Sequence, residues 1–183
     1  MDQPSPHLIR AVNVIDKFTD TTGTWVAWLN VPLVLAVAWE VASRYLFDAP
    51  TIWSFDVTYM LYGTIFMLGA AFALHKGAHI RTDFFFEKWS VRTRGTIDSV
   101  AYLVFFFPSC LMVVYTSWPF VRNSWSVWES SPDPGGIPAR WALKSVIIIG
   151  FVILMIQGLS ELIKRFYVAR GWEQPASRVK EIH

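Results

Sequence analysis

Charge is scarce in this chain of 183 residues: Asp, Glu, Lys and Arg make up 16% of it, whereas 54% of the residues are hydrophobic. Soluble domains usually carry about 25% charged residues, and the mean hydropathy of this chain is +0.37. The chain also lacks a long polar stretch, so its tails and loops are too short to fold as a soluble catalytic domain. These absences argue against an enzyme and indicate a protein with little mass outside a membrane.

Cysteine is almost absent as well. The single cysteine, Cys110, cannot form a disulfide within the chain, and its apolar surroundings predict a small buried side chain. The chain therefore has no disulfide framework, and its stability must come from the packing of apolar segments.

The apolar residues gather in four blocks, each about as long as the roughly 20 residues that a helix needs to cross a bilayer. The blocks cover residues 24–43, 53–74, 99–121 and 141–162. The sequence therefore predicts an all-α integral membrane protein in which residues 1–183 form a single domain of four transmembrane helices. We expect the first block to be retained rather than cleaved as a signal peptide, because Asn30 and Pro32 interrupt it. Pro32 and Pro108 are expected to kink the first and third spans.

The positively charged residues are distributed unevenly among the connections. Twelve of the 16 Lys and Arg residues lie in the N-terminal tail, in the connection between the second and third blocks, or in the C-terminal tail. Only Arg44, Arg122, Arg140 and Lys144 lie near the other two connections. By the positive-inside rule, we expect both termini and the middle connection to be cytoplasmic.

Two segments outside the blocks combine apolar and charged residues. In residues 7–20, apolar residues recur at helical spacing, and residues 80–95 mix Phe and Trp with acidic and basic side chains. We expect both to be interfacial amphipathic segments in contact with membrane lipids, although the first could instead dock on a helix of a partner.

The few ionisable residues of the blocks lie near the block ends. Glu40 precedes Arg44 by one helical turn, Asp56 and Lys144 lie near the start of their blocks, and Glu161 lies at the end of the fourth. We expect structural or interfacial roles for them, because an ion path would need carboxylates or histidines near the middle of a span. The chain by itself is therefore not expected to carry ions or protons.

Two histidines lie close together at the end of the second block. His75 and His79 are one helical turn apart, a spacing at which two histidines can bind one metal ion. A membrane haem would instead need ligands that face each other from different helices, and the other histidines, His7 and His183, lie in the tails. We therefore expect no metal or cofactor and a structural or headgroup-facing role for the pair.

Short motifs at the block ends carry a resemblance to a known family. They are, in chain order, Arg44-Tyr45-Leu46-Phe47 with Pro50 and Trp53, then Gly69-Ala70-Ala71, His79-Ile80-Arg81-Thr82-Asp83, Glu129, Gly136-Ile137-Pro138 with Trp141, and Gln157. In this order, residues 41–165 resemble the small membrane subunit (DctQ family) of the tripartite ATP-independent periplasmic, or TRAP, transporters. Asp56 departs from the family pattern, in which an acidic residue or pair of Glu type often follows the Trp.

The resemblance implies a subunit rather than a complete transporter. In this family the small subunit pairs with and braces a large elevator-type membrane subunit, which holds the substrate and sodium sites. A periplasmic solute-binding protein delivers an organic acid to this pair, and the sodium gradient drives its uptake. The resemblance also implies a multi-pass protein of the bacterial inner membrane, with no nucleic-acid partner.

Two groups of candidate residues follow. Partner-contact or structural roles are expected for seven residues: Glu40, Arg44, Trp53, Asp56, His79, Arg81 and Asp83. In the longest exterior loop, Trp125, Trp128, Glu129 and Asp133 combine aromatic and carboxylate side chains, as docking surfaces often do. We expect these four to receive the solute-binding protein, unless the two indole rings simply rest on the membrane surface.

Two other functions remain open from the residues themselves. A small four-helix proton-coupled exporter would need a carboxylate in the first span, for which Glu40 is the candidate. A haem-bearing membrane anchor of a redox enzyme would need to use the histidines as haem ligands.

Overall fold

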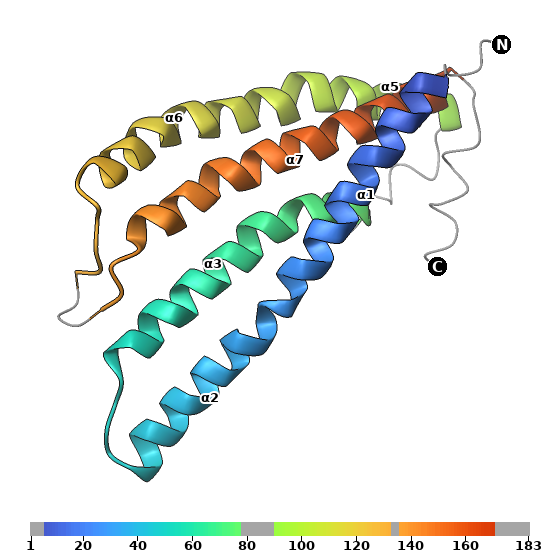
Figure 1. Cartoon of the computed structure of the whole chain (residues 1–183). Coiled ribbons are helices and arrows are strands. Elements are labelled where there is room, and N and C mark those ends of the chain that lie inside the picture. Colours follow the sequence, from blue (N-terminus) through green and yellow to red (C-terminus); the bar gives the residue numbers. More distant parts are fainter. Residues whose placement is uncertain (1–5, 78–89, 133–135, 171–183) are drawn as a thin grey trace.

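The computed structural model describes residues 6–77, 90–132 and 136–170, most of which are helical (Figure 1). The helices are α1 (Pro6–Trp28), α2 (Asn30–Leu46), α3 (Ile52–His75), α5 (Val91–Ala101), a π-helical turn (Tyr102–Phe106), α6 (Phe107–Ser126) and α7 (Arg140–Ala169). Four stretches of these described residues are long and apolar enough to cross a membrane: Pro6–Leu46, Ile52–His75, Val91–Ser126 and Arg140–Ala169. The predicted all-α membrane class and its four spans are confirmed.

Helices α1 and α2 follow one another as a nearly continuous stretch of 41 residues. The break lies at Leu29, because Pro32 has no N–H with which to bond the carbonyl of Trp28. At 1.5 Å per residue the stretch is about 60 Å long, roughly twice the thickness of the hydrocarbon core of a bilayer. Only part of it can therefore cross the hydrocarbon, and the interfacial position expected for residues 7–20 stays a prediction.

Helix α5, the π-helical turn and α6 form the third stretch. The hydroxyl oxygen of Ser90 accepts a hydrogen bond from the N–H of Thr93 at 3.3 Å and caps the start of α5. The π-helical turn ends two residues before Pro108, whose missing N–H leaves the carbonyl of Val104 without its α-helical partner. Residues 91–95 of the expected interfacial segment are the first turn of this long helix, and residues 80–89 lie outside the described residues.

The long helices form a row rather than a closed bundle. Helix α7 packs against α6 on one side and α3 on the other, α3 packs against α2, and α1 crosses α3 and α7 (Figure 1). Among the described elements, α6 makes no extensive contact with α1, α2 or α3. Gly150 of α7 brings two backbones close, since a Cβ there would lie 2.9 Å from the carbonyl oxygen of Met67 in α3. Neighbouring helices thus hold the row together, while its broad faces stay largely uncovered by this chain.

The row has two distinct ends. The connections from α2 to α3 and from α6 to α7 lie at one end, which we call the connection end. The end of α3, the start of α5 and the end of α7 lie at the opposite end, close to α1, which we call the terminal end. This alternation is the one that four successive spans require.

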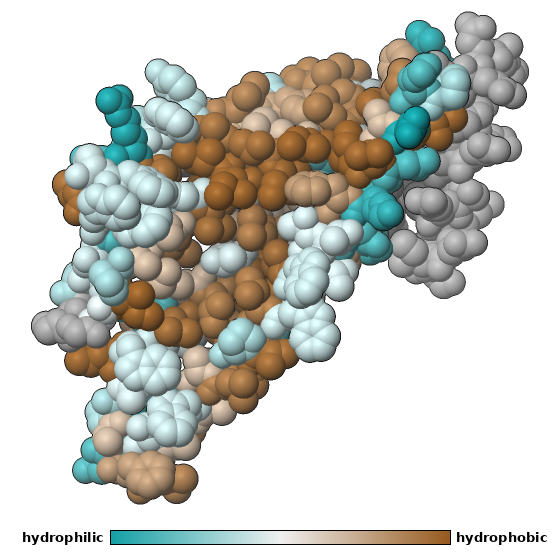
Figure 2. Space-filling model, in the orientation of Figure 1, coloured by the Kyte–Doolittle hydropathy of each residue, from teal (hydrophilic) through white to brown (hydrophobic). Residues whose placement is uncertain are grey.

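The buried apolar core is small. Only seven hydrophobic side chains are buried among the described residues, one of them Cys110 as predicted, whereas many large apolar side chains of α2, α3 and α6 are exposed. Figure 2 shows this apolar surface over the middle of the molecule, with hydrophilic residues toward the ends. A surface of this kind needs lipid or a protein partner to cover it.

Candidate functional site

A buried polar cluster lies at the terminal end, between α1, α3 and α7. We call it the terminal cluster; it consists of Asp16, Thr19, His75, Gln157, Ser160, Glu161 and Lys164. Thr19, Gln157 and Ser160 are almost completely buried, and Asp16 and Glu161 are each only 7% exposed. Carboxylates at this depth need partners within the protein, because little water can reach them.

Lys164 joins the two carboxylates of the terminal cluster. Its Nζ lies 3.0 Å from Oδ2 of Asp16 and 2.5 Å from Oε1 of Glu161. The hydroxyl of Ser160 donates to Oδ1 of Asp16 at 2.7 Å. Two side chains of α7 therefore bind the carboxylate of Asp16 and hold α1 against α7.

Gln157 extends these contacts to the third helix. Its Oε1 accepts from the hydroxyl of Thr19 at 2.7 Å, and its Nε2 lies 3.1 Å from Oδ1 of Asp16. The same Nε2 lies 3.3 Å from Nδ1 of His75 at the end of α3. One buried amide thus contacts α1 and α3 from α7.

The terminal cluster also contains a grouping that could in geometry hold a metal ion. Single ligand atoms of Asp16, His75 and Glu161 lie within 4.8 Å of one another. However, the ammonium group of Lys164 already bonds to both carboxylates and supplies the positive charge they need. The donor set therefore fits an internal ion pair better than a metal site. Of the two histidines singled out in the sequence, only His75 can be placed, because His79 lies outside the described residues.

At the connection end, Asp56 fastens the loop that precedes α7. Its Oδ2 accepts from the N–H of Ile137 at 2.8 Å, and its Oδ1 accepts from the hydroxyl of Ser131 at 3.0 Å. The loop closes on itself as well, since the N–H of Ser131 donates to the carbonyl of Ile137 at 3.2 Å. Gly136 has no room for a side chain here, because a Cβ would overlap Asp56 and Ser131. Asp56 therefore has a structural partner far away in the sequence.

Glu40 likewise bonds to a residue of the connection from α2 to α3. Its Oε1 lies 2.6 Å from Nη2 of Arg44, so the pair expected one helical turn apart is present. Its Oε2 accepts from the N–H of Thr51 at 3.0 Å and from the hydroxyl of the same residue. Trp53 follows in the first turn of α3 and is 42% exposed. The carboxylate of Glu40 is thus engaged at the end of the helix.

Three indole rings pack together at the connection end. The ring centroid of Trp141 lies 4.4 Å from that of Trp125 and 5.2 Å from that of Trp128. The indole N–H of Trp125 donates to the hydroxyl of Ser145 at 2.7 Å. We call these rings the Trp cluster; Trp128 remains 63% exposed.

The backbone of Trp128 adopts a strained conformation. Its φ of 46° lies in the left-handed region, where bulky residues are rare. The following N–H, that of Glu129, donates to the carbonyl of Ser124 at 3.0 Å and closes the end of α6. Glycine is the usual residue at such a position. Trp128 is therefore present despite the conformational free energy that a bulky residue costs there.

Glu129 is paired rather than free. It bonds to Lys144 of α7, whose ammonium group also lies 3.9 Å from the ring centroid of Phe120. The hydrogen bond from Lys144 holds the pKa of Glu129 below its ordinary value, so this carboxylate is charged at neutral pH. Of the four predicted docking residues, the structure brings Trp125, Trp128 and Glu129 together, and Asp133 lies outside the described residues.

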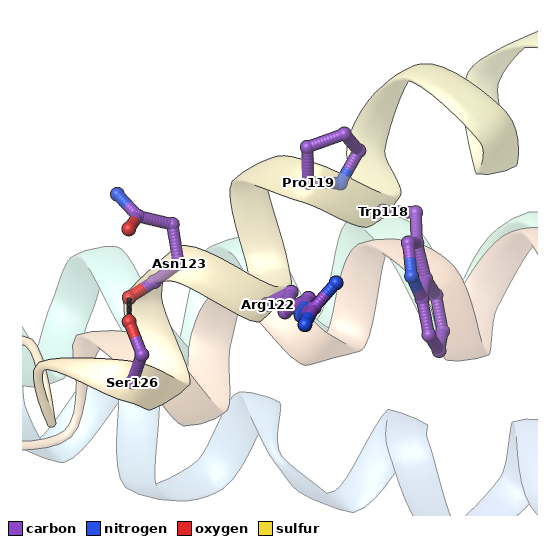
Figure 3. A pocket seen from close by; sticks show the side chains of 5 residues that line it. All are labelled: Trp118, Pro119, Arg122, Asn123 and Ser126. Atoms are coloured by element: carbon purple, nitrogen blue, oxygen red, sulfur yellow. Dashed lines mark hydrogen bonds between the residues drawn. The ribbon is translucent and has the colours of Figure 1, made fainter.

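A shallow recess lies on the outward face of α6. Its lining residues are Trp118, Pro119, Arg122, Asn123 and Ser126, and its volume is about 380 Å³ (Figure 3). All five come from one helix, and the Ser126 hydroxyl donates to the carbonyl of Asn123 at 2.7 Å. An open recess on a single helix offers a contact surface rather than an enclosed ligand site.

In the structure Glu40, Arg44 and Asp56 bond to groups within the chain, whereas the residue patterns did not indicate the terminal cluster. Asp16 counted only as part of the polar side of an amphipathic segment, and Gln157 as a helix contact of unknown partner. A usable signal existed: Gln157, Ser160 and Lys164 recur at spacings of three and four within an apolar helix. His79, Arg81 and Asp83 lie outside the described residues, so their roles stay predictions.

Comparison with known proteins agrees with the resemblance. Residues 33–167 match the family described as "Tripartite ATP-independent periplasmic transporters, DctQ component". The chain is also similar to the sialic acid TRAP transporter small permease protein SiaQ of Vibrio cholerae serotype O1, with 27% identity over 70 residues. That alignment covers 36% of this chain and 40% of the length of the relative. The family match includes both connections of the connection end and the α3 and α7 residues of the terminal cluster.

Proposed function

Because the chain belongs to the family of DctQ components of the tripartite ATP-independent periplasmic transporters, we propose that it is the scaffold subunit of a sodium-driven importer of an organic acid. Members of this family are transporter components and not enzymes. In the proposed complex, a large elevator-type membrane subunit holds the substrate and sodium, and this chain pairs with it and braces it in the bacterial inner membrane. A periplasmic solute-binding protein delivers the substrate.

The main support for the scaffold role is that the polar groups of the chain bond to one another rather than remain free. At the terminal end, the charged and amide groups of Asp16, Gln157 and Lys164 bond to one another across α1 and α7. At the connection end, Glu40 and Asp56 bond to the loops beside them. Polar groups that satisfy one another within the chain stiffen it, whereas a permeation path needs groups that are free to bind the cargo.

The proposed orientation places the terminal end in the cytoplasm and the connection end in the periplasm. The excess of Lys and Arg in the tails and the middle connection supports this orientation. The Trp cluster then faces the compartment of the solute-binding protein. Its exposed rings, with the strained Trp128 among them, support a docking role, because strained backbone conformations are often kept at functional sites.

Transport by the reconstituted complex tests this function. Proteoliposomes that hold this chain and the large subunit should take up substrate only when the solute-binding protein and an inward sodium gradient are supplied. Liposomes that hold either membrane subunit alone should be inactive. Uptake that persists without sodium, or without this chain, would contradict the proposal.

Two observations would favour the alternatives instead. Proton-driven export by this chain alone, abolished by Glu40→Gln, would indicate a small exporter. A Soret absorption band in the purified protein would indicate a haem-bearing anchor. The engagement of Glu40 with Arg44 and Thr51 speaks against the first of these functions.

A further inference from the structure

Helix α3 presents an exposed stripe of large, mostly aromatic residues along most of its length. The stripe comprises Ile52, Phe55, Tyr59, Tyr62 and Phe66, which follow one another at spacings of three and four and are each more than half exposed. These spacings keep the residues on one face of the helix. Since α3 lies inside the row, between α2 and α7, this face opens on a broad side of the molecule.

The two tyrosine hydroxyls make the stripe a poor surface for lipid. Tyr62 follows Ile52 by ten residues in a helix of 24, so it lies near the middle of the span. Within the described part of the chain, neither Tyr59 nor Tyr62 has a hydrogen-bond partner for its hydroxyl. Acyl chains offer no hydrogen-bond acceptor at that depth, and an unpaired polar group in hydrocarbon is costly. A protein partner could accept hydrogen bonds from both tyrosine hydroxyls through its carbonyl or hydroxyl groups.

The stripe continues into a notch of small residues. Gly69 and Ala73 follow Phe66 on the same face, again at spacings of three and four. A Cβ at Gly69 would meet no atom of this chain within 4 Å, so the space beside it is not used by the chain's own packing. Gly150 differs, because α3 already packs against it. An unused notch of this kind allows another helix to approach closely.

We propose that this α3 stripe is the seam along which a transmembrane helix of the large membrane subunit packs. The partner helix lies against the aromatic rings near the connection end and comes closest at Gly69 and Ala73. This assignment rests on the proposed function, since it names the contact surface of the same complex.

The other exposed helices fit this role less well. The side chains that α2 exposes at mid-helix are mainly aliphatic, such as Val34 and Leu35. They carry no hydroxyl group and can face lipid acyl chains without loss of hydrogen bonds. Helix α6 also exposes two hydroxyls of this kind, on Ser109 and Tyr115, but contains no glycine that would let a partner approach. Among the described helices, the α3 stripe alone combines two mid-depth hydroxyls with an unused notch.

Site-specific photo-crosslinking in the complex of this chain with the large subunit tests the seam directly. p-Benzoylphenylalanine at Tyr62 or Phe66 should form a covalent product with the large subunit. The same probe at Phe105 of the π-helical turn or at Leu35 of α2, both well exposed, provides the control and should label lipid only. A product from Phe105, Leu35 or Tyr115 but not from Tyr62 would overturn the seam while leaving the proposed function intact. Failure of the unmodified chains to co-purify would overturn both.

Single substitutions test the notch and the two tyrosine hydroxyls. Gly69→Leu should lower co-purification of the large subunit at least tenfold and leave the helicity and melting temperature of this chain unchanged, because nothing in the chain occupies that space. Val34→Leu, on the exposed face of α2, is the matched control and should have no effect. Tyr59→Phe and Tyr62→Phe should each weaken the complex about threefold, as expected for one interhelical hydrogen bond. Wild-type co-purification of Gly69→Leu would overturn the proposal.

Discussion

Asp16 of α1 and Lys164 of α7 are separated by 148 residues in the sequence, yet Nζ of Lys164 lies 3.0 Å from Oδ2 of Asp16. The pair joins the first and last helices of the chain where α3 also ends. Because Ser160 and Gln157 bond to the same carboxylate, the connection is a small network rather than a single contact. It sets the position of α1, whose apolar residues Val14 and Phe18 remain exposed.

Breaking this pair should destabilise the chain strongly. Lys164→Met leaves Asp16 and Glu161 without their cation, and loss of one partner from a buried pair costs about 3–5 kcal/mol. Thermal unfolding in detergent should show the loss as a lower melting temperature.

The matched control is the pair formed by Lys76 and Asp20, which lies beside the terminal cluster with both side chains about half exposed. Lys76→Met should cost no more than about 1 kcal/mol, because solvent weakens an exposed pair. If Lys164→Met and Lys76→Met lowered the melting temperature equally, the terminal cluster would not be what holds α1 in place.

Asp56→Ala should loosen the loop before α7 without unfolding the helices. The N–H of Ile137 and the hydroxyl of Ser131 lose their acceptor, at a cost of about 1–3 kcal/mol. Hydrogen exchange should become faster in residues 127–139, whereas Asp48→Asn in the other connection should leave that loop unchanged. Unaltered exchange in Asp56→Ala would contradict the anchoring role.

Trp128→Gly removes one exposed ring of the Trp cluster without disturbing the backbone conformation at this position. Glycine adopts the left-handed φ of 46° without strain, so the end of α6 should stay intact. If the exposed ring receives the solute-binding protein, uptake at limiting concentrations of that protein should fall several-fold and recover at saturating concentrations. Trp118→Leu, which lies outside the Trp cluster, serves as the control. Normal uptake by Trp128→Gly at limiting concentrations would count against docking here.

The contact between Glu129 and Lys144 predicts a response to acid. The hydrogen bond from Lys144 lowers the pKa of Glu129 in the folded protein below its ordinary value of 4.5. The stabilisation is therefore complete above pH 4.5 and is lost as the pH falls through the lower, folded-state value. Tryptophan fluorescence of the Trp cluster should change in that acidic range in the wild type and not in Glu129→Gln. Identical pH titrations of the fluorescence in the wild type and in Glu129→Gln would refute the contact.

Cysteine labelling tests the orientation in the membrane. In a background of Cys110→Ser, an impermeant thiol reagent applied to intact cells should label Ser130→Cys, which is exposed at the connection end. It should not label Ser90→Cys, which is exposed at the start of α5 near the terminal end. The reverse pattern would invert the proposed topology.

The sequence alone was sufficient for the features that depend on neighbouring residues. The number of spans follows from the lengths of the apolar blocks. Kinks were expected at Pro32 and Pro108, and the break at Leu29 and the π-helical turn lie close to these two residues, which lack an N–H group. The contact of Glu40 with Arg44 was also predictable, because residues four apart on a helix face each other. The motif order further indicated the family that residues 33–167 match.

The partners of the polar residues were decided only by the tertiary structure. Nothing in the sequence near Asp16 points to Lys164, and nothing near Asp56 points to Ile137, because each pair meets only after the helices have taken their places beside α7. The same holds for the row of helices: all four spans are apolar on most sides, so hydrophobic periodicity does not tell which helices become neighbours. Close contacts such as that of Gly150 with Met67 determine the order of the row, and that order leaves the aromatic face of α3 exposed.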